Sequence, residues 1–255
     1  MTAADLQAAI QSLRARLDGT QAEALLRKGG EAGLLQQAGL DDPYLARWLR
    51  AEKNNVDRAA ARLLKHAEWR AEFVPNGSIA KAEVERELAS QKSFLQGTDK
   101  HGRPVIVMLA KRHLRAVRDV EETKRFICYV LDATINRMDH KLNQSGTLTS
   151  IFDLRGFGMD NYDFATLRNV FDLLQYHYPE RLGMLYMYEA GVVFQGLWKL
   201  VSPFVDPVTK AKVRFVSGAA ALAEFARQID PKILPVDLGG MSELIPIDQA
   251  LQRPL

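Results

Sequence analysis

The chain has 255 residues, of which 47% are hydrophobic and 25% charged, and its net charge is +3 at pH 7. This composition is ordinary for a folded globular protein and excludes the fibrous and disordered classes. The basic excess is weaker than that of a dedicated nucleic-acid binder, so no nucleic-acid partner is expected, whereas an anionic membrane surface is compatible with it.

The N-terminal segment and the cysteine content indicate a reduced compartment. The segment MTAADLQAAIQSLRARL is amphipathic and contains acidic residues, unlike a secretory signal. The single cysteine, Cys128, lies in the apolar run FICYVL, which favours a buried thiol and leaves no partner for a disulfide within the chain. We therefore expect a cytoplasmic protein.

The first ninety residues show helical spacing. In DDPYLARWLRAEKNN, Asp41 or Asp42 is suited to cap a helix, and Pro43 stands in its first turn, where the missing N–H does no harm. A second helix is expected over residues 56–73. Its predicted apolar stripe consists of Val56, Ala60, Leu63, Leu64, Ala67 and Phe73.

Strands alternating with long helices follow. Strands are predicted at residues 93–99, 104–109, 148–154, 184–190 and 212–216, and helices at residues 120–143, 162–178 and 192–205. Because the helices are long enough to serve as crossovers, the strands are expected to pair mostly in parallel in an α/β architecture. The predicted division is a helical section over residues 1–92, an α/β domain over 93–240 and a C-terminal tail over 241–255.

No motif points to catalysis. Gly156 and Gly158 follow a predicted strand, but a third glycine at the spacing of a nucleotide-binding loop is missing. The five histidines show no metal-ligand spacing, and there is no G-x-S-x-G sequence. Asp153 ends an apolar strand, and a catalytic role for it would need a second acid that the sequence does not offer. The sequence therefore favours a protein that is not an enzyme and holds no metal or cofactor.

One segment is unusually apolar. Residues 192–205 contain nine large apolar side chains and a single charge, Lys199. The segment is shorter than the roughly 20 residues of a membrane span. Two interpretations stay open: a core helix packed on both faces, or a cover over an apolar ligand.

Several motifs, in this order and spacing, resemble the CRAL-TRIO lipid-binding family of the yeast phosphatidylinositol transfer protein, cellular retinaldehyde-binding protein and tocopherol transfer protein type. They are LARWLRAEKNNVDRAAARLLKHAEWR, DKHGRPVIV, IFDLRG, YPERLG and FQGLWKLVSPFVDPVTKAKVRFV, which together extend over roughly residues 40–240. The resemblance implies a sheet that floors a lipid cavity and a helical gate over it. The gate and lipid-tail residues that it implies are Phe194, Leu197, Trp198, Val201, Phe204 and Val205.

The resemblance also implies a head-group site. Members that bind phosphatidylinositol hold it with a glutamate, a threonine and a lysine that match Glu180, Thr209 and Lys212. The usual arginine of the helical section is replaced by Glu52, whose carboxylate would repel a phosphate, so Lys53 and Arg50 are the alternative cations. An ion pair between Glu180 and a neighbouring base such as Arg181 is the structural alternative for the glutamate.

The positions that bind choline in related carriers do not match. Tyrosines there correspond to Leu95 and Ile106, and the strand hydroxyls to Leu148 and Ser150. A cage for a quaternary ammonium group needs aromatic rings that these positions lack.

These observations predict a soluble, monomeric, non-enzymatic lipid-transfer protein. It would hold one phospholipid, with phosphatidylinositol favoured and a second lipid unidentified, and would associate transiently with membranes. The alternatives are a carrier of a small hydrophobic ligand of the retinoid or tocopherol kind, and a lipid-presenting regulator of lipid kinases.

Overall fold

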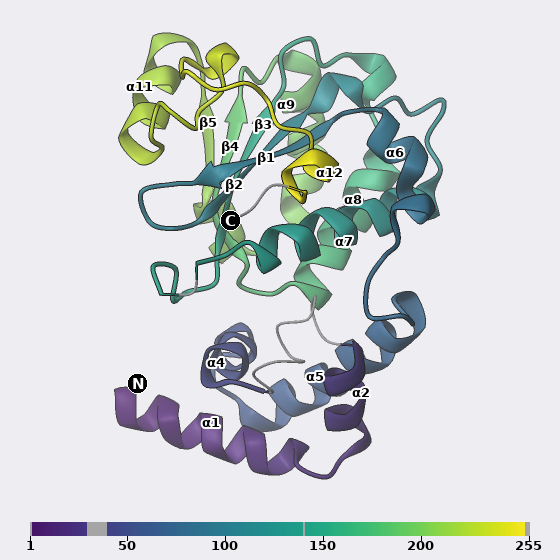
Figure 1. Ribbon diagram of the computed structural model, residues 1–255, viewed down its shortest axis with the longest axis vertical. Helices are drawn as coiled ribbons and strands as arrows, with labels where there is room; N and C mark the ends of the chain where they lie inside the picture. The colour runs from purple at the N-terminus through teal and green to yellow at the C-terminus, as the bar shows by residue number, and fades with distance from the viewer. Residues whose placement is uncertain (1, 30–39, 140, 253–255) are drawn as a thin grey trace. The chain divides into compact units, whose positions relative to one another are not determined.

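The computed structural model describes residues 2–29, 40–139 and 141–252 (Figure 1). Contacts divide the chain into two compact units. The first, here called the helical unit, comprises residues 1–79 together with 174–180. The second, the sheet unit, comprises residues 80–173 and 181–255.

The main helices of the helical unit begin where the sequence offers caps. They are α1 (Ala3–Leu17), α2 (Gln21–Gly29), α4 (Asp42–Ala51) and α5 (Val56–Phe73). Asp41 caps α4, because its carboxylate accepts the backbone N–H of Tyr44 at 2.8 Å, and Pro43 lies in the first turn. The predicted start of this helix is confirmed, and Asp41 is its capping residue.

The buried stripe of α5 differs from the predicted one. Leu64, placed on that stripe by its hydrophobicity, is 37% exposed, so this part of the prediction is wrong. The buried face instead includes two polar side chains, His66 and Arg70, which contact His177 and Tyr178. The buried residues of α5 are Ala59, Leu63, His66, Ala67 and Arg70.

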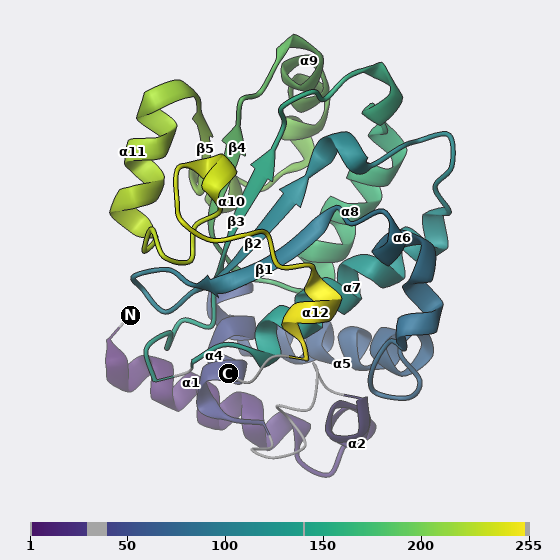
Figure 2. The same ribbon diagram turned by 45° about the horizontal axis from the view of Figure 1, so that its top comes forward.

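The sheet unit contains five strands in the order β1-β2-β3-β4-β5 (Figure 2). They are β1 (Ser93–Thr98), β2 (Pro104–Leu109), β3 (Leu148–Asp153), β4 (Leu182–Tyr188) and β5 (Val213–Val216). The β1–β2 pair is antiparallel and the other pairs are parallel. The carboxyl ends of β2 to β5 therefore share one edge of the sheet, called here the carboxyl edge, and their starts share the amino edge. The predicted fold class is confirmed.

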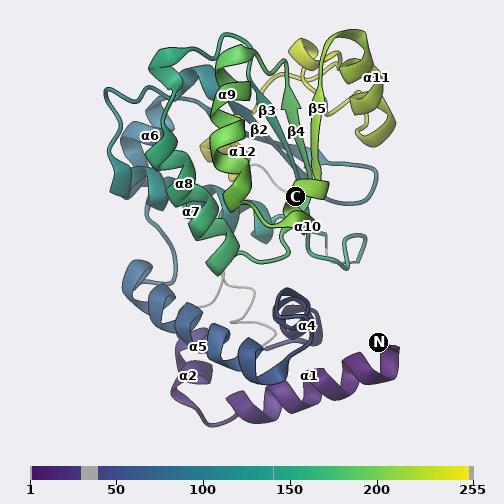
Figure 3. The same ribbon diagram turned by 180° about the vertical axis from the view of Figure 1, so that it is seen from behind.

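Helices cover both faces of this sheet (Figure 3). They are α6 (Glu85–Ala89), α7 (Val120–Asn136), α8 (Phe164–His177), α9 (Val192–Val201), α10 (Pro207–Ala211), α11 (Gly218–Gln228) and α12 (Ile247–Ala250). Phe225 of α11 packs against Tyr186 and Tyr188 on one face, whereas Phe194 of α9 belongs to the core of the other. The sequence predictions did not include α11, and they extended α7 seven residues too far, to 143.

The segment after α11 protects the free edge of β1. The backbone N–H of Leu95 donates to Ile245 O at 3.0 Å, and the Gln96 side chain donates to Glu243 O at 2.9 Å. An unpaired edge strand is a site for unwanted association, and these bonds occupy it.

Candidate lipid-binding site

One face of α9 packs on the sheet. Gly191 caps the helix, and Pro203 lies in the 3-10 turn Ser202–Phe204 that follows it. Phe194, Leu197 and Val201 are at most 4% exposed. These side chains, spaced three and four residues apart, form one helical face and share a core cluster with strand residues such as Leu185 and Met187 and with Val205.

Aromatic rings extend this cluster. The ring of Phe157 meets that of Phe194 edge-on, with centroids 5.4 Å apart. Trp198 is half-buried, and its ring lies 6.4 Å from Phe171 and 5.7 Å from Phe215. The face of the sheet under α9 is therefore lined with the large apolar side chains that an acyl chain or another apolar molecule would contact.

The opposite face of α9 and the turn after it are apolar and open to solvent. Val192 is 83% exposed, Leu200 54% and Phe204 51%, and Val208 in α10 is 56% exposed. Phe204 lies beneath the guanidinium of Arg168, 5.1 Å from ring centroid to Cζ. An ordinary core helix buries its apolar residues, whereas α9 buries one set and displays another.

Two head-group candidates lie in the short segment after α9. Asp206 caps α10 by accepting the backbone N–H of Thr209 at 2.9 Å. Lys212 ends the same helix, and its carbonyl accepts the backbone N–H of Leu185 at 3.0 Å, which ties it to the start of the β4–β5 pairing. Both side chains are partly exposed, so they could reach a ligand.

Glu180 belongs to the helical unit, in a segment held by two buried arginines. Arg47 of α4 donates to Pro179 O at 3.0 Å, and Arg70 of α5 donates to the hydroxyl of Tyr178 at 3.1 Å. Both guanidinium groups are at most 2% exposed. Glu180 itself adopts a left-handed backbone conformation with φ 58°, which is strained for a residue with a side chain. The two arginines therefore hold in place the two residues that precede Glu180.

Arg181 follows Glu180 in the chain and belongs to the sheet unit. It is buried in the sheet unit, and its guanidinium donates to Gly146 O at 2.9 Å. The same bond explains Gly146, which adopts φ 64° and would place a Cβ atom 2.8 Å from that guanidinium nitrogen.

A pair of histidines completes this part of the helical unit. The Nδ1 atoms of His66 and His177 are 3.3 Å apart, and the ring of Trp69 stacks on His177 with centroids 3.7 Å apart. Burial, with the nearby charges of Arg62 and Arg70, lowers the pKa of His177 to about 4. This histidine is therefore neutral at pH 7.

The Glu52 carboxylate has protein partners. It pairs with Arg62 at 2.8 Å and with Arg58 at 2.9 Å, and only 12% of its side chain is exposed. Lys53 and Arg50, in contrast, are exposed. Glu52 and these two cations belong to the helical unit together with Glu180, whereas Thr209 and Lys212 belong to the sheet unit.

The positions that correspond to choline ligands form a row across three strands. Leu95 pairs with Ile106, and Ile106 with Ser150. All three residues are buried, and Ile106 points away from the core that contains Val105 and Val107. This row lies on the α9 side of the sheet and carries no aromatic ring, as the sequence predicts.

Two features are absent from residues 2–29, 40–139 and 141–252. No helix in those ranges is long and apolar enough to cross a bilayer. No group of three or more histidine, cysteine, aspartate or glutamate side chains in them is arranged to hold a metal ion.

Comparison with known proteins identifies the family. The CRAL/TRIO domain matches residues 88–240. The SEC14 cytosolic factor of Eremothecium gossypii is 32% identical over 236 residues, which cover 83% of this chain and 74% of that protein. The chain belongs to the CRAL-TRIO lipid-binding family.

Other CRAL-TRIO proteins are similar over a smaller share of their length. The phosphatidylinositol transfer protein CSR1 of Eremothecium gossypii is 30% identical over 213 residues, 79% of this chain and 48% of that protein. The CRAL-TRIO domain-containing protein C3H8.02 of Schizosaccharomyces pombe is 30% identical over 210 residues, 78% of this chain and 46% of that protein. The chain thus spans about half the length of these two relatives.

A solved structure shares the fold of this chain. The crystal structure of Sfh5 superposes with a TM-score of 0.66 over 99% of this chain and 96% of that one, at 15% sequence identity. The sequence comparisons therefore confirm the predicted family, and the structure comparison supports the fold.

Sequence reasoning missed the two arginines that hold the segment before Glu180. A signal was present, because Arg47 and Arg70 occupy positions three or four residues from apolar residues on the buried faces of their helices. A charged residue on such a face has to be paired in the interior. The partner could not be read from the sequence, since Tyr178 and Pro179 lie more than a hundred residues later.

Proposed function

We propose that this CRAL-TRIO protein is a lipid carrier rather than an enzyme, and that α9 is the gate of its lipid site. The observation that supports this is the pair of apolar surfaces on α9, one packed on the sheet and one exposed to solvent. A closed gate would shield the lipid in water, and an open gate would present its outer residues to the bilayer. At about 0.8 kcal/mol per methylene group, an unshielded sixteen-carbon chain would cost on the order of 10 kcal/mol in water.

We infer further that the lipid is phosphatidylinositol. Glu180 could accept bonds from inositol hydroxyls, while Lys212 and Thr209 complement a phosphate. The name of the CSR1 relative, a phosphatidylinositol transfer protein, supports the same ligand. The protein would work in the cytoplasm as a monomer that touches membranes transiently, without a cofactor.

Mass spectrometry of lipid extracted from the purified protein tests the ligand. Phosphatidylinositol in stoichiometric amount would support the proposal, whereas a retinoid, a tocopherol or no lipid would contradict it. Transfer between liposomes separates a carrier from a lipid-presenting regulator, because the latter would bind lipid without moving it.

The head-group assignment has its own test. Lys212→Ala should lower phosphatidylinositol loading by about 2 kcal/mol, or roughly 30-fold, because the phosphate loses a charge-assisted partner. Lys210→Ala, two residues earlier at an exposed position, is the matched control. Equal loss of every lipid in Lys212→Ala would assign the residue a structural role instead.

A further inference from the structure

Three apolar side chains are exposed in the connections that follow β2 and β3 at the carboxyl edge of the sheet unit. Leu114 and Val117 follow β2 and are 46% and 72% exposed, and Met159 follows β3 and is 67% exposed. The two connections are in contact, because the backbone N–H of Arg115 donates to Asp160 O at 3.0 Å. We call these three residues, together with the basic residues Lys111, Arg112 and Arg115, the edge patch.

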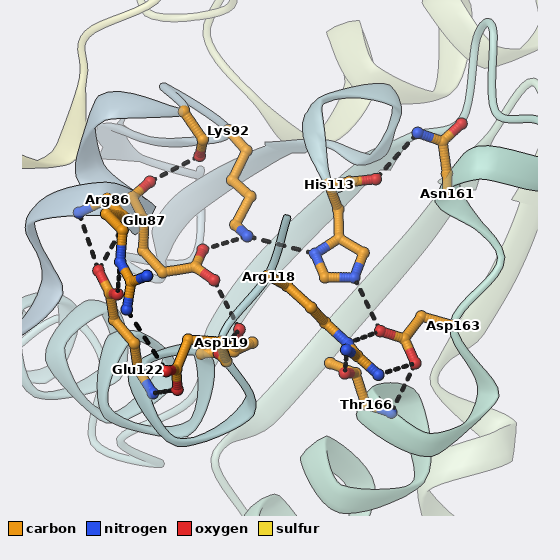
Figure 4. Close-up of polar contacts among 12 residues, drawn as sticks. Arg86, Glu87, Lys92, His113, Arg118, Asp119, Glu122, Asn161, Asp163 and Thr166 are labelled. Carbon is orange, nitrogen blue, oxygen red and sulfur yellow. Dashed lines mark hydrogen bonds and ion pairs between the residues drawn. The ribbon is translucent and has the colours of Figure 1, made fainter. Parts of the chain in front are cut away.

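Buried polar contacts hold the β2 connection in this position (Figure 4). The side-chain amide of Asn161 donates to Lys111 O and to His113 O, each at 2.9 Å. Asn161 is 6% exposed, so these bonds are shielded from water. They fix the turn that immediately precedes Leu114.

The histidine of this connection is itself clamped. Lys92 Nζ lies 3.3 Å from His113 Nδ1, and His113 Nε2 lies 3.3 Å from Asp163 Oδ2. Because an ammonium group can only donate, Nδ1 accepts and Nε2 carries the proton. Burial, followed by the charge of Lys92, lowers the pKa of His113, which keeps this neutral tautomer.

The far end of the connection is fixed by an ion pair. Arg118 binds Asp163, and its Nε also donates to the hydroxyl of Thr166 at 2.8 Å. Burial alone would raise the pKa of Asp163, but the bonds from Arg118 and Thr166 lower it to about 2. With both ends held, Leu114 and Val117 cannot fold back into the core, so their exposure is built into the fold.

The charge of the patch favours an anionic partner. Lys111, Arg112 and Arg115 are exposed, and Asp160 is an exposed acid beside them, so these four side chains carry a net charge of +2. Within the described part of the chain, no carboxylate lies within ion-pair distance of Lys111 or Arg115. Cations around a few apolar tips suit a bilayer interface, where the apolar groups enter and the cations meet phosphates.

We propose that the edge patch docks the protein on an anionic lipid surface. The site is distinct from the outer face of α9, although α9 follows β4 at the same edge and begins there with the exposed Val192. Docking through the patch would therefore bring the start of α9 to the bilayer. This inference does not depend on which lipid the protein carries.

Flotation of the full chain with two kinds of vesicle tests the docking. Vesicles of phosphatidylcholine with phosphatidylserine should bind the protein, and vesicles of phosphatidylcholine alone should bind it weakly. Each basic residue at an anionic surface strengthens binding about fivefold, so Lys111→Glu with Arg115→Glu should weaken it by at least about 30-fold. The control is Lys141→Glu with Lys232→Glu, which changes the net charge equally at exposed positions near the amino edge.

A fluorescent probe tests whether the patch enters the bilayer. Because Cys128 is buried, Val117→Cys offers a single accessible thiol for an environment-sensitive dye. The dye should brighten and shift to the blue with phosphatidylserine vesicles, and a dye at Met241→Cys, also highly exposed, should not.

Three results would overturn the proposal: equal binding to both vesicle types, equal weakening by the control pair, or no spectral shift at position 117. Equal weakening by the control pair would assign the vesicle binding to the overall charge of the chain instead of the patch. The gate is tested separately, because a charge on α9 should abolish lipid transfer while leaving vesicle binding through the patch largely intact.

Discussion

Leu200→Glu tests the gate most directly, because Leu200 belongs to the exposed set of α9. The side chain is 54% exposed, so a glutamate there is solvated in the closed state. Exposed substitutions change the free energy of unfolding by about 0.5 kcal/mol or less, which is about 1–2 °C in Tm for a chain of this size. Folding and lipid retention in water should therefore be preserved.

At the membrane the same change is expensive. Moving the exposed half of a leucine from water into the bilayer stabilises the membrane-bound gate by about 1 kcal/mol. The variant loses this contribution. Bringing a carboxylate into the bilayer adds a penalty of about 1–2 kcal/mol near the interface, below the value for the bilayer centre. The sum of about 2–3 kcal/mol predicts transfer that is about 30- to 150-fold slower.

Liposome-to-liposome transfer of a fluorescent phospholipid measures this effect. Leu142→Glu is the matched control, because Leu142 is 70% exposed and precedes β3, at the opposite edge of the sheet. Leu200→Ala should give an intermediate loss of about fivefold, since it removes apolar area without adding charge. Transfer by Leu200→Glu at the wild-type rate, or equal loss in Leu142→Glu, would refute the assignment of α9 as the gate.

Two further predictions concern stability. The pKa of His177 is about 4 in the folded protein, below its ordinary value of 6.5 in the unfolded chain. Protonation therefore favours the unfolded chain, so the folded protein has its full stability above pH 6.5 and loses stability as the pH falls towards 4. The expected loss, discounted for partial exposure, is about 1–2 kcal/mol in urea unfolding, and His177→Gln but not the exposed His101→Gln should abolish it. Gly240→Ala should destabilise the protein by about 3 kcal/mol, since its Cβ would lie 2.0 Å from Leu234 O; a melting temperature unchanged from the wild type would contradict this close approach.

The pattern of apolar residues predicted the strands and α9 because each of them alternates or repeats with the period of its structure. It did not predict α11, although Ser217 stands at the N-cap position and Ala221 and Phe225 are spaced as one helical face. The buried residues of this helix are only Ala221 and Phe225, so its apolar stripe is short and was not recognised as a helix. The end of α7 at Asn136 was missed because apolar residues continue past it, at Met138.

The position of Glu52 shows why charge alone could not settle the head-group site. Because Glu52 matches the arginine of phosphatidylinositol binders, the sequence predicts that its carboxylate repels the phosphate of the lipid. In the structure it is bound by Arg58 and Arg62, so the three side chains together carry a net charge of +1. An arginine at this position would place three guanidinium groups together and remove the carboxylate that holds them, so it would destabilise the helical unit before it could attract a phosphate. The exposed Lys53 and Arg50, neighbours of the matched position, stay the predicted cations for an anionic group.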